Sequence, residues 1–135
     1  MEIINANTLS AKDVLLALIS KVETTKTKEQ IDEWLLLNLG TDLFGAWLLY
    51  DKDEPVGMLI VETTPDNDAY IAFEWTRSGI SKDGLLNKAE EWASNLDLKR
   101  IVKYTNKSPT TYIKKFGWSI WQTVLVGCRK NLVDA

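Results

Sequence analysis

Carboxylates, lysines and tyrosines carry most of the acid–base chemistry open to this chain, because its 135 residues include no histidine. The absence of histidine excludes Ser-His-Asp and Cys-His nucleophiles, and it excludes histidine ligands for a metal. Proton transfer is therefore left to Asp, Glu, Lys, Tyr, the single Cys128 or bound water. Much of the enzyme catalogue is removed by this one observation.

Two further groups of reactive residues carry weak signals. Cys128 is the only cysteine, which excludes a disulfide within the chain and a cysteine-rich zinc site. Its apolar neighbours are typical of a buried, inert thiol. Asp51, Asp53 and Glu54 resemble half of a calcium loop, but the glycine and the distal glutamate of an EF-hand are missing. The sequence therefore predicts a solvated turn there and no metal site.

Six tryptophans invite a stacking interpretation. Four of them fall on apolar helix faces or within β-type runs, and we expect these to pack in the core. They are Trp34, Trp47, Trp75 and Trp92. Trp118 and Trp121 alternate poorly with their neighbours, so they are the two candidates for a groove wall or a dimer contact.

The charge is unevenly distributed along the chain. Residues 1–98 hold 8 basic and 18 acidic side chains, whereas residues 99–135 hold 8 basic side chains and Asp134 alone. Such a split is typical either of a face for phosphates or an acidic partner, or of a surface on which the two signs interleave after folding. We expect no nucleic-acid partner, because the basic residues are spread over several predicted elements and no RNA-binding signature is present.

Length and composition predict one domain spanning residues 1–135. The chain is 45% hydrophobic and 26% charged, and it contains no repeat, low-complexity tract or linker. The N-terminus lacks the basic lead-in of a signal peptide, and no apolar run approaches the length of a membrane span. A cytoplasmic protein with no membrane partner is the expectation.

Apolar spacing predicts four helices that would position these side chains. Ser10-x-x-Asp13 is a cap signal for the first, and Thr27-x-x-Gln30 is a capping box for the second, which should stop at Gly40. A strongly amphipathic third helix runs from Leu85 to Leu96. The fourth begins at Ser108-Pro109 and ends at Gly117.

Five β-type runs separate these helices. Residues 44–50, 56–61 and 69–76 are joined by short turn-forming segments and predict an antiparallel meander. Residues 99–105 and 118–128 follow as further strands. The predicted order is α-α-β-β-β-α-β-α-β, which indicates an α/β or α+β sheet protein.

This element order resembles the GNAT acyltransferase superfamily, and two stretches strengthen the resemblance. Residues 85–93, LLNKAEEWA, are similar to the family's LL-x-x-A-E-x-W-A helix after the meander. Residues 106–118, NKSPTTYIKKFGW, are similar to its N-x-x-(small)-x-x-x-(aromatic)-x-K-x-G-F segment. Over about residues 44–130 the resemblance implies a GNAT-like fold with a mixed, mostly antiparallel sheet flanked by helices. It also implies an acetyl-CoA cofactor and an amine substrate.

The resemblance places the cofactor along one loop and one strand. The family's pyrophosphate loop, [RQ]-x-x-G-x-[GA], falls on residues 77–82, with Ile80 and Lys82 where two small residues belong. Gly79, the following helix N-terminus and the charge of Lys82 still suit phosphate. The pantetheine arm would pair with the strand backbone from Ala72 to Glu74. The implied cofactor-binding residues are Ala72, Phe73, Arg77, Ser78, Gly79, Ile80, Ser81, Lys82 and Asn106.

The catalytic residues implied by the resemblance are less complete. The position of the family's tyrosine acid holds Ile113, and Tyr112 stands one residue earlier, about 100° away around a helix. Tyr112 is thus either the acid or a packing aromatic. Glu74 is the first candidate for the base that takes the amine proton, and Glu62 is the second.

Two functions follow from these observations. One is an acetyl-CoA-dependent N-acyltransferase that acts on an amine. The other is a non-catalytic GNAT-like accessory or structural protein that works through protein contacts or as a homodimer. The chain also resembles small phage-encoded GNAT-like proteins. In those proteins the last helix also starts with Asn-x-Ser and has an aliphatic residue in the tyrosine position. Ile80, Lys82 and Ile113 favour the second function, and the scaffold's usual use favours the first.

Overall fold

A seven-stranded sheet is the centre of the molecule in the computed structural model, which describes residues 1–22, 24–105, 118–122 and 126–132. The strand order is β1-β2-β3-β4-β5-β7-β6. Only β4 and β5 pair in parallel in this part of the chain, and every other pair is antiparallel. The strands are β1 (Glu2–Asn5), β2 (Phe44–Asp51), β3 (Glu54–Thr63), β4 (Asp68–Thr76), β5 (Arg100–Thr105), β6 (Ser119–Gln122) and β7 (Val126–Asn131). The predicted mixed, mostly antiparallel sheet is confirmed.

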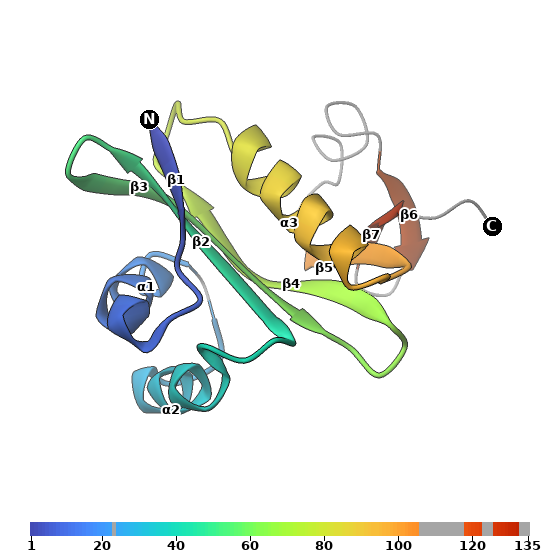
Figure 1. Ribbon diagram of the computed structural model, residues 1–135, viewed down its shortest axis with the longest axis horizontal. Coiled ribbons are helices and arrows are strands. Elements are labelled where there is room, and N and C mark those ends of the chain that lie inside the picture. The colour runs from blue at the N-terminus through green and yellow to red at the C-terminus, as the bar shows by residue number, and fades with distance from the viewer. Residues whose placement is uncertain (23, 106–117, 123–125, 133–135) are drawn as a thin grey trace.

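Helices cover both faces of this sheet and create two cores (Figure 1). On one face, α1 (Lys12–Ile19) and α2 (Lys28–Asn38) pack over the meander, and a short 3-10 turn, η1 (Leu9–Ala11), precedes them. On the other face, α3 (Asp83–Asn95) packs on Leu59, Val61 and their neighbours. We call these the α1/α2 face and the α3 face.

Local sequence signals explain how α2 begins and where the chain turns after it. Thr27 and Gln30 form the predicted capping box, in which the Thr27 side chain accepts from the Gln30 N–H and the Gln30 side chain accepts from the Thr27 N–H. Gly40 follows the end of α2 with φ +88°, a left-handed conformation that favours glycine. The cap predicted at Ser10 is wrong, because Ser10 lies inside η1 and Ala11 is the N-cap of α1.

The two ends of the sheet differ from the prediction. Residues 2–5 form an extra edge strand paired with β2, Ile3 opposite Leu49, although the sequence contains no strand signal there. The single run predicted over residues 118–128 is two antiparallel strands, β6 and β7, because so long an apolar run exceeds an ordinary strand and turns back on itself. The helix predicted at 108–117 lies outside the described residues.

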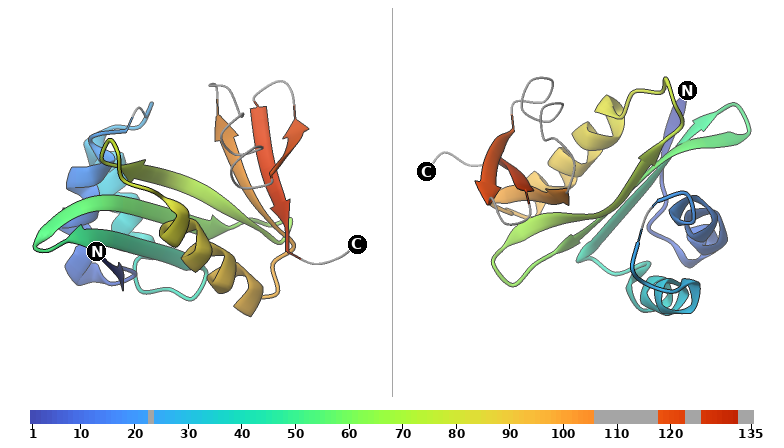
Figure 2. Two further views of the ribbon diagram at one scale, coloured as in Figure 1. Left: turned by 90° about the horizontal axis from the view of Figure 1, so that it is seen from above. Right: turned by 180° about the vertical axis from the view of Figure 1, so that it is seen from behind.

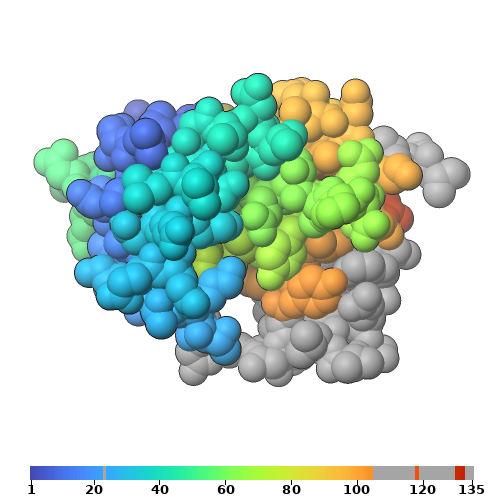
Figure 3. Space-filling view, turned by 90° about the horizontal axis from the view of Figure 1, so that it is seen from below, coloured from blue at the N-terminus to red at the C-terminus, as the bar shows by residue number. Residues whose placement is uncertain are grey.

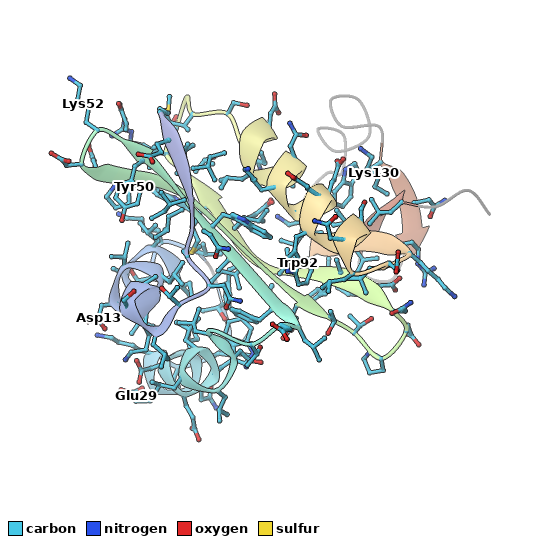
Figure 4. All side chains as sticks on the ribbon, viewed as in Figure 1. Asp13, Glu29, Tyr50, Lys52, Trp92 and Lys130 are labelled. Carbon is cyan, nitrogen blue, oxygen red and sulfur yellow. The ribbon has the colours of Figure 1, made fainter. Side chains whose placement is uncertain are left out.

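Charged and aromatic residues of the C-terminal part form contacts within the folded protein. Lys130, labelled in Figure 4, donates to Glu90 at 2.7 Å, and Arg100 forms a two-fold contact with the buried Asp68, so these basic residues pair with acidic residues from earlier in the chain. Trp118 is 3% exposed and belongs to the α3-face core, so its expected place in a groove is wrong. The four tryptophans predicted to be in the core all pack against one of the two cores.

Candidate functional site

The two central strands diverge beyond their first three paired residues. β4 and β5 pair only from Asp68 opposite Arg100 to Tyr70 opposite Val102, although β4 continues to Thr76 and β5 to Thr105. Figure 2 shows the two strands separating from this point. Among the described residues, no strand pairs with this edge of β4 beyond Tyr70. The backbone of residues 71–76 therefore presents one edge that an extended ligand can join by hydrogen bonds.

A β-bulge lies where the divergence begins. Ile71 is opposite Val61 and Phe73 is opposite Ile60, so Ala72 is an extra residue in β4. Ala69 and Ile71 pack in the α3-face core, whereas Phe73 packs in the α1/α2-face core. The bulge thus reverses the alternation of side chains and turns Glu74 to the α3 face. Three consecutive apolar residues, 71–73, are the sequence signal for it.

Glu74 joins three elements on the α3 face. Its side chain is only 10% exposed, and its Oε1 accepts from the ammonium groups of Lys82, at 3.1 Å, and Lys103. Lys82 is the N-cap of α3 and Lys103 lies on β5. These contacts tie the start of α3 and the diverging β5 to β4, beside a shallow recess that Leu85 and Leu86 also line.

The loop from residue 77 to 82 is held by contacts within the protein. The Arg77 N–H donates to the Val56 carbonyl at 2.8 Å, and its guanidinium lies 3.1 Å from Glu54 and 3.7 Å from Asp51. Gly79 has φ +83° with no atom near its missing side chain, and Ile80 packs on the α3-face core. Arg77 is thus paired with the carboxylates of the β2–β3 turn that had resembled half of a calcium loop.

The N-terminus of α3 supplies donors and also one negative charge. The first helical N–H groups lack partners inside the helix, and the Asp83 N–H donates to the hydroxyl oxygen of Ser81 at 3.2 Å. A side chain on Gly84 would lie 2.7 Å from the Cδ1 end of the Ile3 side chain, which would have to move aside. The exposed Asp83 carboxylate stands in the first turn, where an anion would bind. The first turn of α3 therefore combines N–H donors that suit an anion with a carboxylate that opposes one.

A second carboxylate lies one strand away on the α1/α2 face. Glu62 is opposite Phe44 on β2 and opposite Tyr70 on β4. Burial raises the pKa of Glu62 above its ordinary 4.5, against the opposing effects of the Lys26 charge and a hydrogen bond from the Trp34 side chain. The pKa of Tyr70 is also raised, first by burial and then by the charge of Glu62 and the neighbouring Tyr104.

Aromatic rings surround this carboxylate. Trp34 contacts Phe44 and Phe73 edge-on, with centroids 5.2 and 5.6 Å apart, and the Tyr70 and Tyr104 rings are 5.8 Å apart. Sequence reasoning named Glu62 but missed Tyr70 and Tyr104 as its neighbours. The position of Tyr70 could have been predicted from the register of the antiparallel meander. The position of Tyr104 could not, because it depends on the parallel pairing of β4 with β5.

The remaining predicted residues fall in three places. Ala72 and Phe73 lie at the bulge, and the residues from 77 to 82 form the loop described above. Asn106 and Tyr112 lie outside the described residues, as does the position of Ile113. Within the part of the chain that the structure describes, there is no cluster of three Cys, Asp or Glu residues able to hold a metal, and no helix is long and apolar enough to cross a membrane.

Comparison with known proteins relates this arrangement to solved structures. No family model and no curated protein sequence matches the chain. A GNAT-family acetyltransferase from Staphylococcus aureus Mu50 superposes with a TM-score of 0.78 at 16% identity, covering 98% of this chain and 99% of that one. The aminoglycoside 6'-acetyltransferase type Ii gives 0.77 at 17% identity, covering 100% and 99%.

An aminoglycoside 6'-N-acetyltransferase solved with coenzyme A gives a TM-score of 0.74 at 15% identity, again covering 100% of this chain and 99% of the other. All three similarities extend over nearly the whole chain, and all three identities are low. They establish the architecture and leave the chemistry to the residues of this chain. The protein has the fold of the GNAT acetyltransferases.

Proposed function

We propose that this protein is an acyl-CoA-dependent N-acyltransferase of the GNAT superfamily. The observation that carries the proposal is the divergence of β4 from β5 after Tyr70, which leaves the backbone of residues 71–76 with one unpaired edge among the described strands. The pantetheine arm contains amide groups that pair with such an edge as a strand would. The neighbour solved with coenzyme A shares this fold over the whole chain.

We infer where the two ends of the cofactor would lie from the residues beside the diverging strands β4 and β5. The loop of residues 77–82 and the N-terminus of α3 face the phosphate end, with Gly79 and the first-turn N–H groups as the contacts. An arm laid along β4 from this loop ends where β4 and β5 rejoin, at Tyr70 and Val102. Bound acyl-CoA supplies a thioester carbonyl that an amine can attack.

Glu62 is better placed than Glu74 to take the proton of the amine. Glu74 is held by Lys82 and Lys103 on the α3 face, so its oxygen already accepts from two ammonium groups. Glu62 lies next to Tyr70, and its raised pKa makes it a stronger proton acceptor than an ordinary glutamate. It accepts the proton directly or through a water as the nitrogen–carbon bond forms and the carbon–sulfur bond breaks. Tyr112 remains the predicted donor of the proton that the leaving thiolate needs.

A second function, protein contact without catalysis, is favoured by the phosphate end of the site. Arg77 is paired with Glu54 and Asp51, Ile80 is packed against the core, and Asp83 adds a negative charge where phosphate would bind. A GNAT-like accessory protein would have no need for that end. Binding of the cofactor separates the two functions.

Thermal melting with and without acetyl-CoA tests the proposal. A ligand present at 100 times its Kd adds about 2.7 kcal/mol of stability and raises the melting temperature. We expect such a shift at millimolar acetyl-CoA, together with release of free thiol when an amine is added. If millimolar acetyl-CoA leaves the melting temperature unchanged, the enzyme proposal is wrong and the accessory function takes its place.

A further inference from the structure

A row of side chains crosses the sheet on the α1/α2 face from a covered end to an open one. Phe44, Glu62 and Tyr70 are direct neighbours on β2, β3 and β4, and the Tyr70 ring continues to Tyr104 on β5. Phe44 is 1% exposed, Glu62 and Tyr70 are partly exposed, and Tyr104 is 38% exposed. Figure 3 shows sheet residues at the surface, in yellow-green, between α2 and β5 on this side. The carboxylate therefore lies at the inner end of a surface that opens to solvent.

Aromatic rings form the walls of this surface. Trp34 on α2 is fixed by its edge-on contacts with Phe44 and Phe73, while Tyr70 and Tyr104 form the side toward β5. Aromatic faces around a carboxylate are the surroundings that bind organic cations, because the ring faces and the carboxylate are both negative. A neutral or anionic ligand gains neither of these attractions.

A primary ammonium group of the protein itself already lies in these surroundings. The Lys26 Nζ is 5.7 Å from the centroid of the Trp34 ring, and the charge of Lys26 acts on Glu62. The Lys26 side chain is chemically an n-butylammonium ion, so the structure shows that a linear alkylammonium fits beside Trp34. Lys26 is exposed and lies in the segment that joins α1 to α2.

We propose that Glu62, Trp34 and Tyr70 form the binding site for a linear alkylammonium acceptor, and that Lys26 occupies this site as an internal substitute until the acceptor displaces it. The description of the ligand as an acceptor rests on the proposed function. The site itself rests on the contacts above. The acceptor approaches from the face opposite α3, at the level where β4 and β5 rejoin, so its nitrogen arrives where an arm along β4 would end.

The hold on Lys26 is weak enough to be broken. A cation over an aromatic ring at an exposed site contributes an attraction that corresponds to about a two- to fivefold change in an equilibrium constant. Removal of the Lys26 ammonium should therefore tighten alkylammonium binding by about two- to fivefold. Removal of the Glu62 charge should weaken it by more than tenfold, because the carboxylate is the only formal negative charge we assign to the site.

Equilibrium titration of the full chain with n-butylammonium, in the absence of acyl-CoA, tests this proposal. The readout is the side-chain indole signal of Trp34 in a proton–nitrogen NMR spectrum, assigned by its loss in Trp34→Phe. Lys26→Met should tighten binding about two- to fivefold, and Lys28→Met, which removes an exposed lysine two residues away, should leave it unchanged. Glu62→Gln should lose more than tenfold, and n-butanol should not bind to the wild-type chain.

Each contrary result has one meaning. Equal affinities of Lys26→Met and Lys28→Met would show that Lys26 does not compete for the site. An unchanged affinity of Glu62→Gln, with the fold verified by circular dichroism, would show that the carboxylate does not bind the ammonium. The melting shift with acetyl-CoA is measured on the same variants. Its absence while n-butylammonium still binds would overturn the proposed function and leave the ammonium site intact.

Discussion

Two glutamates on adjacent strands of this sheet differ in what surrounds their side chains. Glu74 on the α3 face is almost buried and is paired with two lysines from two other elements. Glu62 on the α1/α2 face is half-buried among aromatic rings, and burial raises its pKa. The first arrangement stabilises a charge and fixes the positions of strands, while the second leaves a carboxylate ready to accept a proton or a cation. We therefore propose that the less stabilised of the two, Glu62, carries the function.

Because Ala72 is an extra residue in β4, Phe73 packs on the α1/α2 face and Glu74 lies on the α3 face. Insertion of one alanine between Phe73 and Glu74 should produce the largest effect, since it would move Glu74 to the α1/α2 face and Trp75 out of its packing there. Burial of an unpaired carboxylate and loss of a packed aromatic together cost more than about 4 kcal/mol, enough to prevent folding of a small domain.

The matched control for this insertion is Ala72→Gly, which keeps the length of β4 and should cost only about 1 kcal/mol. Circular dichroism and urea unfolding compare the two variants. An insertion variant that folds and melts like the glycine variant would show that β4 absorbs the added residue without moving Glu74 to the other face.

Glu74→Gln should give the next largest effect. It keeps the shape of the side chain but leaves two partly buried ammonium groups facing a neutral amide. Breaking a fully buried ion pair costs about 3–5 kcal/mol, and the partial exposure of the two lysines reduces the expected loss to about 2 kcal/mol. Urea unfolding measures this loss of stability, provided that the unfolding free energy depends on urea concentration with the same slope in the variant and the wild type.

A double variant separates pairing from packing at this cluster. If the loss arises from unpaired charge, Lys103→Met should recover part of the stability in the Glu74→Gln background and should destabilise the wild-type chain. Additive effects of the two substitutions would mean that Glu74 and Lys103 do not stabilise one another.

Glu62→Gln should change stability in the opposite direction and make the protein more stable. Because the folded pKa of Glu62 is above its ordinary 4.5, the folded state holds the proton more tightly than the unfolded state, and stability is lost as the pH rises through the folded pKa. Glutamine does not titrate. The variant should therefore be more stable than wild type at pH 7 and equal to it near pH 4.

The gain should stay below about 1 kcal/mol, since Glu62 is half exposed and solvent screens its charge. Melting at the two pH values measures it, and the charged groups in reach are Lys26 and, when ionised, Tyr70. A variant less stable than wild type at pH 7 would show that the contacts with Lys26 and Trp34 outweigh the burial of the carboxylate.

The features that could be predicted from the sequence differ from those that could not in how far apart in the chain their residues lie. The Thr27–Gln30 capping box, the stop at Gly40 and the three-strand meander all depend on residues close together in the chain, and each is confirmed. Glu74 was correctly placed on the third strand of the meander. Its partner Lys103 could not be predicted, because that contact depends on where β5 diverges from β4.

Edge strands and bulges were the other failures. β1 has four residues, too few for an apolar period, and it exists because its backbone pairs with β2 far along the chain. The bulge at Ala72 interrupts the alternation of apolar residues only once. Both features are set by contacts with a partner strand, and the three consecutive apolar residues 71–73 are the one local signal of the bulge.

Asp83→Asn should have the smallest effect on stability, and it bears on the phosphate end of the site. A carboxylate in the first turn of α3 stabilises the helix through the aligned peptide dipoles by about 0.3–1 kcal/mol, which the variant should lose. The same positive potential attracts phosphate, so Asp83 and the cofactor compete for it. The asparagine variant should therefore bind acetyl-CoA more tightly while melting at a slightly lower temperature.

Ionic strength provides the decisive readout for Asp83. A repulsion between an exposed carboxylate and a phosphate is screened by salt, so the advantage of Asp83→Asn over wild type should shrink as salt is raised from low to physiological levels. Asp97→Asn, at an exposed position just after α3, removes the same charge away from the loop and should leave acetyl-CoA affinity unchanged. Equal effects of the two substitutions would mean that net charge, rather than the N-terminus of α3, governs the binding of the cofactor.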